Sequence, residues 1–273
     1  MSLIALASAS GSPGVSTTAL GLALGWPRPV LLVEADPTGA SAVASGYLRG
    51  QVEPPNAMTD LVNAHFDDRL RETLAQVSID LPQSQARVVP GAKSHDQARS
   101  LLALWDPLLA VLRSLEETGQ DVIVDAGRLG LYGWPEPLVY GADLMLLVTR
   151  TELARLAAAV SWANTLREKF EQAGAAASLG LLLVGEKEPY TAREITRVLQ
   201  LPTLAKVMWD PVSAAVISEG KDVPKATLRE RATGRGHWAD RPLNRSLRAT
   251  RSAITGVIRA NEERLAATAG GPA

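Results

Sequence analysis

The first part of the chain combines glycines with hydroxyl side chains in a pattern that can bind phosphate. An apolar stretch, residues 3–8, is followed by Gly11, Ser12, Pro13, Gly14, Val15, Ser16, Thr17 and Thr18. This pattern predicts a strand, a tight turn and a helix over residues 17–25, a geometry that points backbone N–H groups and a positive helix end at an anion. Thr18 would add a hydroxyl ligand for Mg²⁺. The alternative interpretation is an ordinary strand-to-helix turn with Ser16 as the N-cap.

The loop lacks the cation that such phosphate-binding loops usually carry. In the pattern G-x-x-x-x-G-K-[ST] the lysine contacts the outer phosphates, but Thr17 stands at the lysine position and Ser16 at the last glycine. A hydrogen bond to a charged group contributes about 1.5–3 kcal/mol, so each absent lysine contact should weaken nucleotide binding by about one to two decades. Pro13 also removes a backbone donor. We therefore predict weak nucleotide affinity and weak stabilisation of a transferring phosphoryl group.

Five segments follow one another in the order of the motifs of the ParA/MinD family of P-loop ATPases, which the chain resembles over roughly residues 2 to 220. The segments are residues 12–19, 29–39, 120–127, 141–150 and 201–220. The first is similar to the deviant motif K-G-G-V-G-K-T-T but has Ser12 and Thr17 at the two lysines. The second resembles the D-x-D-P-Q-G turn with Glu34 at the first aspartate, and the third resembles the Walker B strand. The chain is thus identified as an atypical member with a degenerate Walker A motif.

The resemblance implies a site for ATP and Mg²⁺ at the ends of these strands. Its phosphate cradle would be residues 11–18. The implied catalytic residues are Asp36 and Asp125, and the implied Mg²⁺ ligands are Thr18, Asp36 and Asp125. The implied neighbours of the base are Asp210, Pro211 and Val212, whereas Gly185, Glu186 and Lys187 stand where the family often has an adenine-contacting asparagine.

Each of the charged residues also has a plainer interpretation. A buried Asp125 must be paired, hydrogen-bonded or near a metal, and a structural cap would satisfy it as well as a Mg²⁺ site. Asp36 precedes a proline, a combination that often starts turns, and Asp210 is suited to start a helix. Arg128 either replaces the missing lysine charge or is a solvated surface residue. The three histidines are far apart and show no metal-ligand spacing.

Apolar runs of strand length alternate with helical patterns, which is typical of a parallel sheet covered on both faces. Strands are expected at residues 3–8, 30–34, 86–89, 121–125, 143–149, 179–184 and 204–208. Helices are expected at residues 17–25, 59–64, 67–76, 95–118, 152–173, 190–199, 211–218 and 243–267, with a capping box at Thr191 and Glu194. We predict a single-domain α/β fold with a mostly parallel twisted sheet. Residues 1–242 would form the P-loop domain, with the helix of residues 243–273 docked on it and frayed from about residue 266.

Composition limits the classes of protein to which the chain can belong. Its 273 residues are 46% hydrophobic, enough for one large core, and the absence of cysteine excludes disulfides and thiolate sites. The sequence has no apolar run long enough to span a membrane, so we predict a cytoplasmic protein. The net charge is −1, but Lys221 to Arg251 carry nine basic and three acidic residues. That segment either contacts DNA phosphates nonspecifically or is a solvated arm.

Two functions agree with these observations. The first is a positioning or scaffold factor for chromosome or plasmid partition, or for placement of a pilus or secretion machine, with weak or no ATP hydrolysis. The second is an active switch that dimerises with ATP, hydrolyses it slowly and contacts DNA. The resemblance implies a homodimer and a protein partner from a partition, pilus or secretion system in both cases.

Overall fold

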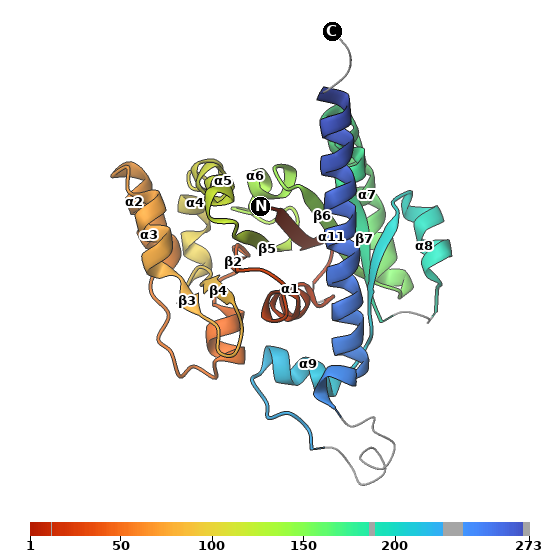
Figure 1. Ribbon diagram of the computed structural model, residues 1–273, viewed down its shortest axis with the longest axis horizontal. Coiled ribbons are helices and arrows are strands. Elements are labelled where there is room, and N and C mark those ends of the chain that lie inside the picture. Colours follow the sequence, from red (N-terminus) through yellow and green to blue (C-terminus); the bar gives the residue numbers. More distant parts are fainter. Residues whose placement is uncertain (12, 186–188, 226–236, 270–273) are drawn as a thin grey trace.

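A computed structural model of the protein describes residues 1–11, 13–185, 189–225 and 237–269. An eight-stranded sheet forms its centre in the order β3-β4-β2-β5-β1-β6-β7-β8 (Figure 1). The strands are β1 (Leu3–Ser8), β2 (Val30–Glu34), β3 (Ile79–Asp80), β4 (Ala86–Val89), β5 (Asp121–Arg128), β6 (Leu144–Arg150), β7 (Leu179–Val184) and β8 (Thr203–Val207). Neighbouring strands are parallel except β3, which pairs antiparallel with β4. The predicted α/β class is confirmed.

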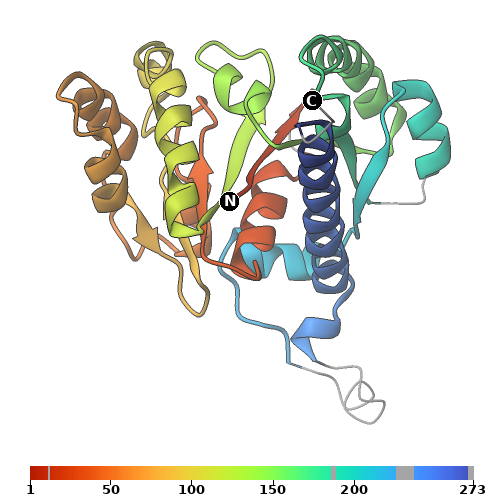
Figure 2. The same cartoon turned by 45° about the horizontal axis from the view of Figure 1, so that its top comes forward.

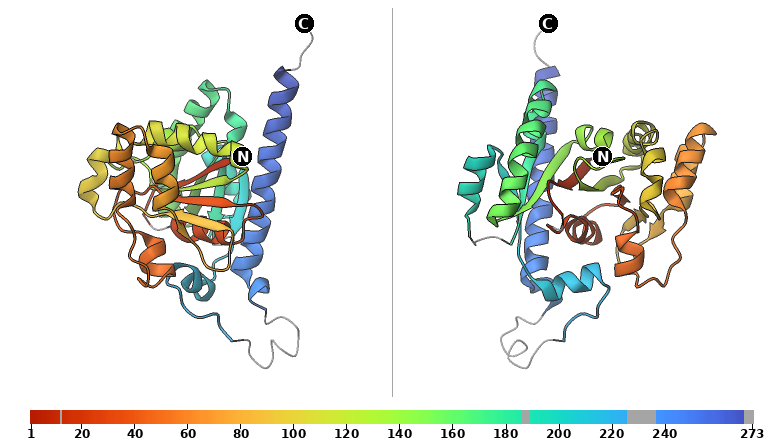
Figure 3. Two further views of the ribbon diagram at one scale, coloured as in Figure 1. Left: turned by 60° about the vertical axis from the view of Figure 1, so that its left-hand side comes forward. Right: turned by 180° about the vertical axis from the view of Figure 1, so that it is seen from behind.

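Helices cover both faces of the sheet, as the continuous apolar strands require (Figure 3). The α-helices are α1 (Val15–Leu24), α2 (Ala57–Phe66), α3 (Leu70–Val77), α4 (Ala98–Leu101), α5 (Trp105–Ser114), α6 (Glu136–Tyr140), α7 (Leu153–Gln172), α8 (Ala192–Leu199), α9 (Pro211–Ser218) and α11 (Pro242–Ala269). Helices α1, α9 and α11 pack on one face, and α2 to α8 lie on the other. Every residue of the central strand β1 is buried. No helix in the described part of the chain is both long and apolar enough to cross a membrane.

The long helix α11 lies beside α1 and crosses the sheet next to β8 (Figure 2). Its buried stripe consists of Leu243, Leu247, Ile254 and Ile258. The two helices approach closely because Gly21 has no side chain: a Cβ there would lie 2.7 Å from Leu247 Cδ1. Arg251 Nη1 also donates a hydrogen bond to Gly21 O, at 3.1 Å. The helix continues to Ala269, and residues 270–273 of the tail predicted to fray lie outside the described residues.

The single helix predicted over residues 95–118 is wrong. The segment divides into a 3₁₀ turn, α4, α5 and a second 3₁₀ turn. Pro107 has no N–H and is tolerated only in the first turn of a helix. A new helix therefore begins at Trp105, two residues before the proline.

The short elements that were not predicted from the sequence include the edge strand β3, the five-residue helix α6 and a π-helical turn at Val43–Tyr47. Each is too short to show a hydrophobic period. The capping box is confirmed: Thr191 Oγ1 accepts from Glu194 N, and Glu194 accepts from Thr191 N at 2.8 Å. Helix α8 therefore starts at Ala192, not at residue 190.

Candidate functional site

The loop after β1 turns into α1 at a glycine. Gly14 has a φ of 105°, a conformation that residues with a Cβ rarely adopt, and α1 begins directly after it at Val15. Thr18 N–H donates to Gly14 O at 2.9 Å, so the first-turn N–H groups before Thr18 remain outside the helical ladder. The interpretation of Ser16 as the N-cap is wrong, because Gly14 holds that position and Ser16 lies inside the helix.

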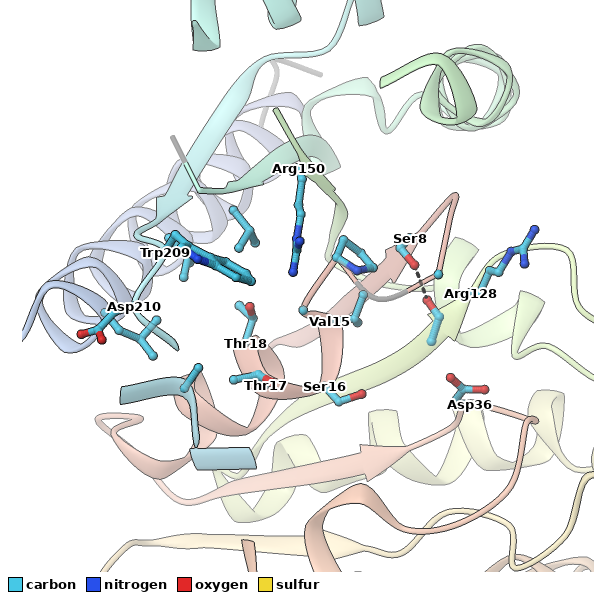
Figure 4. Close-up of a pocket in the computed structure, with 18 of the residues that line it drawn as sticks. Ser8, Val15, Ser16, Thr17, Thr18, Asp36, Arg128, Arg150, Trp209 and Asp210 are labelled. Atoms are coloured by element: carbon cyan, nitrogen blue, oxygen red, sulfur yellow. Dashed lines mark hydrogen bonds between the residues drawn. The ribbon is translucent and has the colours of Figure 1, made fainter. Parts of the chain in front are cut away.

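A cavity of about 620 Å³ opens at the carboxyl edge of the sheet, above this loop (Figure 4). Its lining includes residues from β1, the loop, α1, the ends of β5, β6, β7 and β8, and the start of α11. The predicted site residues in this lining are Gly11, Pro13, Gly14, Val15, Ser16, Thr17, Thr18, Asp36 and Asp210. The fold thus brings together residues that are up to about 200 positions apart in the sequence. Ser12, Glu186 and Lys187 lie outside the described residues.

Asp125 is buried near the end of β5, behind the loop. One carboxylate oxygen accepts a hydrogen bond from Gly127 N at 3.0 Å, and the Ser16 side chain donates another. Burial raises the pKa of Asp125 to about 6, against the effect of both hydrogen bonds, and the nearby Asp36 raises it further. The carboxyl group therefore lies in an environment that would favour an added positive charge.

Asp36 lies at the mouth of the cavity, and its Oδ1 accepts from Thr38 N at 2.9 Å. This hydrogen bond is the turn predicted for an Asp-Pro sequence. The carboxyl group packs so closely on Gly127, which has a φ of 60°, that a Cβ on residue 127 would collide with it. The structure thus combines the turn with a carboxylate that faces the cavity.

Glu34, the residue at the family's first aspartate, is a third buried carboxyl group next to Asp125 in the sheet register. Ser41 Oγ donates to Glu34 Oε2, Val43 N donates to Oε1 at 2.9 Å and Gly91 N donates to Oε2 at 3.3 Å. Burial nevertheless raises the pKa of Glu34 to about 7. These contacts hold the segment after Asp36 against the end of β4.

Arg150 and Trp209 are two residues of the cavity lining that were not predicted as site residues from the sequence. Arg150 is the last residue of β6, and its guanidinium carbon lies 4.1 Å from the centre of the Trp209 ring. Figure 4 shows the Arg150 side chain pointing into the cavity above Thr18. The sequence offers one signal for them: Arg150 directly follows the strand predicted over residues 143–149, and Trp209 directly follows the strand predicted over residues 204–208. Hydrophobic periodicity does not distinguish such a position from a surface position.

Of the three residues predicted to neighbour the base, one lines the cavity. Asp210 lines the cavity and also caps α9, since its carboxylate accepts from Ser213 N at 3.1 Å and Ser213 Oγ at 2.6 Å. Pro211 and Val212 are not among the residues that line the cavity, and Trp209 is. Arg128 is exposed, and Figure 4 shows its guanidinium pointing away from Thr17 and Thr18.

The oxygen ligands present suit Mg²⁺. This ion binds in proteins through one or two carboxylates together with water and substrate phosphates, and Asp36, Asp125 and the Thr18 hydroxyl would supply protein oxygens of that kind. The mutual repulsion of Asp36 and Asp125, which raises the pKa of Asp125, is what a divalent cation would relieve. No group of three or more His, Cys, Asp or Glu residues suited to a metal occurs among the described residues, and Mg²⁺ with a phosphate ligand does not need one.

The basic segment from Lys221 to Arg251 is described only in part. Arg229, Arg231 and Arg235 lie outside the described residues. In the described part, Arg248 donates to Ala239 O at 2.8 Å, and Arg251 packs on α1, where burial lowers its pKa. Arg245 is exposed on α11. Arg251 is therefore engaged within the protein, whereas the exposed basic residues of the described part are Lys221, Lys225, Arg245 and Arg248.

No protein-family model and no curated protein sequence matches the chain. Solved structures are similar to it in fold. The ParA family ATPase from Chlorobium tepidum TLS has a TM-score of 0.69 and 16% identity, with 93% of this chain and 97% of that chain covered. The septum site-determining protein MinD complexed with Mg-ADP from Pyrococcus horikoshii OT3 has a TM-score of 0.64 and 20% identity, with 93% and 97% covered.

The MinC:MinD cell division protein complex from Aquifex aeolicus is also similar, with a TM-score of 0.66 and 12% identity over 94% of this chain and 96% of that chain. Structures this similar over nearly their whole length share one topology, although the sequences have diverged widely. The chain has the ParA/MinD-like P-loop ATPase fold, as predicted from the order of its motifs.

Proposed function

We propose that the protein is an atypical ParA/MinD-like positioning or scaffold factor with weak or absent ATP hydrolysis. It would serve chromosome or plasmid partition, or place a pilus or secretion machine. The fold supports a positioning role at the level of the family, since the structural neighbours include cell-division and ParA family ATPases. The MinD neighbour was solved with Mg-ADP, which supports the same cavity as the site for any nucleotide.

The observation that carries the proposal is the chemistry of the phosphate loop. Neither lysine position holds a cation, and Ser16, at the last glycine position, directs its hydroxyl to Asp125. Transfer of a phosphoryl group depends on cations that meet its developing negative charge. A loop without such a cation should bind nucleotide weakly and stabilise the transition state poorly.

Calorimetric titration with ATP and ADP, with and without Mg²⁺, tests the proposal together with a phosphate-release assay. We expect weak or undetectable heats and turnover at or below the slow rates of ParA/MinD ATPases. Tight ATP binding with steady phosphate release, both abolished by Thr18→Ala, would contradict the proposal.

The proposal includes a homodimer that depends little on ATP. The cavity opens at the sheet edge where ligands of open α/β folds bind, and in the resembled family that edge is the dimer face. Ser12 is too short to reach across to a second subunit's phosphates as a lysine would. Sedimentation with and without Mg·ATP tests this: a clear shift from monomer to dimer on adding ATP would contradict the scaffold and favour the switch.

The second candidate, an ATP-dependent switch that contacts DNA, is supported by the three retained oxygen ligands Thr18, Asp36 and Asp125. Its DNA contact would use the exposed basic side chains of the segment from Lys221 to Arg251. Arg245→Glu should then flatten the salt dependence of binding to random duplex DNA. Arg251→Glu is unsuitable for this test because Arg251 packs on α1. Absence of binding at low salt would exclude the DNA contact.

A further inference from the structure

We infer that Arg150 is the phosphate-binding cation of the cavity, held in position by Trp209, and that it supplies part of the charge missing with the lysines absent at Ser12 and Thr17. The inference rests on the proposed nucleotide site and assigns the residue on which its affinity depends. The ligand class is a phosphate or pyrophosphate group, as in a nucleoside diphosphate or triphosphate.

The strand register places Arg150 at the phosphate loop. In the β1·β6 pairing Ser8 lies opposite Val148, so Arg150 extends two residues beyond the end of β1, at the edge where the loop leaves that strand. On its other side Arg150 pairs with Val184, another residue of the cavity lining. The side chain thus starts between two cavity walls and points above Thr18 (Figure 4). A group bound at the start of α1 would lie in front of it.

Among the described residues, the positive charge of Arg150 is only weakly compensated. The nearest carboxylate oxygen in that part of the chain, Glu152 Oε1, lies 4.0 Å from Nη1, and the Glu152 side chain is itself 55% exposed. The guanidinium lies instead over the Trp209 ring, a contact that orients a cation without neutralising it. The Nε atom of Arg150 is buried and has no hydrogen-bond partner within residues 1–11, 13–185, 189–225 and 237–269. A buried donor of this kind is costly to leave unsatisfied, and a phosphate oxygen is an acceptor that fits a guanidinium well.

Arg128 is the matched comparison within the same cavity. Among the described residues of the lining, Arg128 and Arg150 are the two with a positive charge. Arg128 is exposed and points away from the loop, whereas the Arg150 side chain is only 24% exposed. An exposed charge contributes little to binding, so these two arginines should differ strongly in their effect on a phosphate ligand.

The experiment measures binding of Mg·ADP, inorganic pyrophosphate and adenosine to four proteins by calorimetry: the full chain, Arg150→Gln, Arg150→Lys and Arg128→Gln. We expect Arg150→Gln to weaken ADP and pyrophosphate binding by about 10- to 100-fold. Arg128→Gln should change the affinities for ADP and pyrophosphate by at most about fivefold. Adenosine binding should not change with Arg150→Gln, since adenosine has no phosphate. Circular dichroism and urea unfolding verify that the variants fold.

A second measurement separates a direct charge contact from a structural effect. Thr17→Lys places a lysine in the loop, and we expect its gain in phosphate affinity to be larger in the Arg150→Gln background than in the unmodified chain. Such non-additivity arises when two cations serve the same ligand. A purely structural role of Arg150 would give equal gains in both backgrounds and would overturn the inference.

Several other results would also decide whether Arg150 binds phosphate. Equal affinities for the full chain and Arg150→Gln, or equal losses in Arg150→Gln and Arg128→Gln, would overturn the assignment of Arg150. If the full chain binds neither ADP nor pyrophosphate at millimolar concentration, Arg150 is not a phosphate site, while a scaffold without nucleotide remains. Rapid ATP hydrolysis would overturn the proposed function. A loss of phosphate affinity in Arg150→Gln would still support Arg150 as the phosphate-binding cation of the cavity.

Discussion

The two ends of β5 each carry a buried aspartate, and the two carboxyl groups have different hydrogen-bond and ion-pair partners. Asp121, at the amino end, accepts from Ser2 N and Trp26 Nε1, both at 2.8 Å, and from Arg28 Nε at 2.9 Å. Asp125, near the carboxyl end, accepts from Gly127 N and Ser16 but forms no ion pair within the described residues. Its pKa is raised to about 6 by burial and by Asp36.

The difference distinguishes a carboxylate with an ion pair, Asp121, from one that has hydrogen bonds but no ion pair among the described residues, Asp125. At the amino edge a guanidinium and an indole satisfy the buried charge, so Asp121 joins the first residues of the chain to the sheet. At the carboxyl edge Asp125, Glu34 and Asp36 lie near one another and accept hydrogen bonds, and none of the three forms an ion pair within the described part of the chain. Buried carboxyl groups with raised pKa values cluster at functional sites. The edge where the pKa values are raised is also the edge at which the cavity opens.

The largest change in the free energy of unfolding is expected from removing the carboxyl group of Asp121. Asp121→Ala would leave the Trp26 indole N–H and the Ser2 N–H buried without acceptors and Arg28 without its partner. Each unsatisfied buried donor costs about 1–3 kcal/mol, so the variant should lose about 4 kcal/mol in its free energy of unfolding. Urea denaturation measures this. The control Asp143→Ala, which removes a single acceptor of Leu3 N, should lose only about 1 kcal/mol; similar losses would contradict the comparison.

At the other end of the strand, removing the charge of Asp125 is expected to raise the free energy of unfolding. The folded pKa of Asp125, about 6, exceeds its ordinary value of 3.8, so its favourable contribution is complete below about pH 3.8 and is lost as pH rises through about 6. Asp125→Asn has no charge to bury and should stabilise the protein by about 2 kcal/mol above that range. It should have little effect at low pH.

Urea denaturation below and above this pH range tests whether Asp125→Asn stabilises the protein. Asp121→Asn serves as the control and should be destabilising at neutral pH. A destabilising Asp125→Asn above pH 6 would show that the carboxylate is already compensated, and would remove the contrast between the two ends.

A smaller effect is expected at Glu34. Its pKa is raised from 4.5 to about 7, so the stability that it contributes is complete below about pH 4.5 and is lost as pH rises through about 7. Ser41→Ala removes a donor to the carboxylate and should raise this pKa further, at a cost of about 1–2 kcal/mol near neutral pH. Carbon-13 NMR titration of the glutamate carboxyl groups measures the pKa.

Ser45→Ala is the matched control for Ser41, because the Ser45 hydroxyl donates to Ser41 O and not to Glu34. An unchanged Glu34 pKa in Ser41→Ala, or an equal shift in Ser45→Ala, would disprove the role assigned to the Ser41 hydroxyl.

The smallest effect concerns the serine at the last glycine position of the loop. Ser16→Ala removes the hydrogen bond that lowers the pKa of Asp125, so that pKa should rise above about 6, with a loss of at most about 1 kcal/mol in the free energy of unfolding. NMR titration of the aspartate carboxyl groups measures the shift. Thr17→Ala, the control, should leave the pKa of Asp125 unchanged.

Much of the fold was predictable because its signals are local. The apolar runs of β1, β2 and β7 and the capping box at Thr191 each specify their element within a few residues. The helix predicted over residues 95–118 failed because one proline outweighs a long helical pattern. The alternative interpretation with Ser16 as the N-cap failed because the sequence does not show which glycine adopts a positive φ. The order of the motifs correctly predicted the ParA/MinD-like fold.

The sequence by itself determined the strand and helix pattern, the loop that turns into α1 and the absence of lysines in that loop. Only the tertiary structure decided which charges face one another, because parallel strands bring their carboxyl ends to one edge whatever their separation along the chain. Arg150 and Trp209, 59 positions apart, meet there through the ends of β6 and β8. Asp121 and Asp125, four positions apart on one strand, have opposite environments because their carboxyl groups lie toward opposite edges of the sheet.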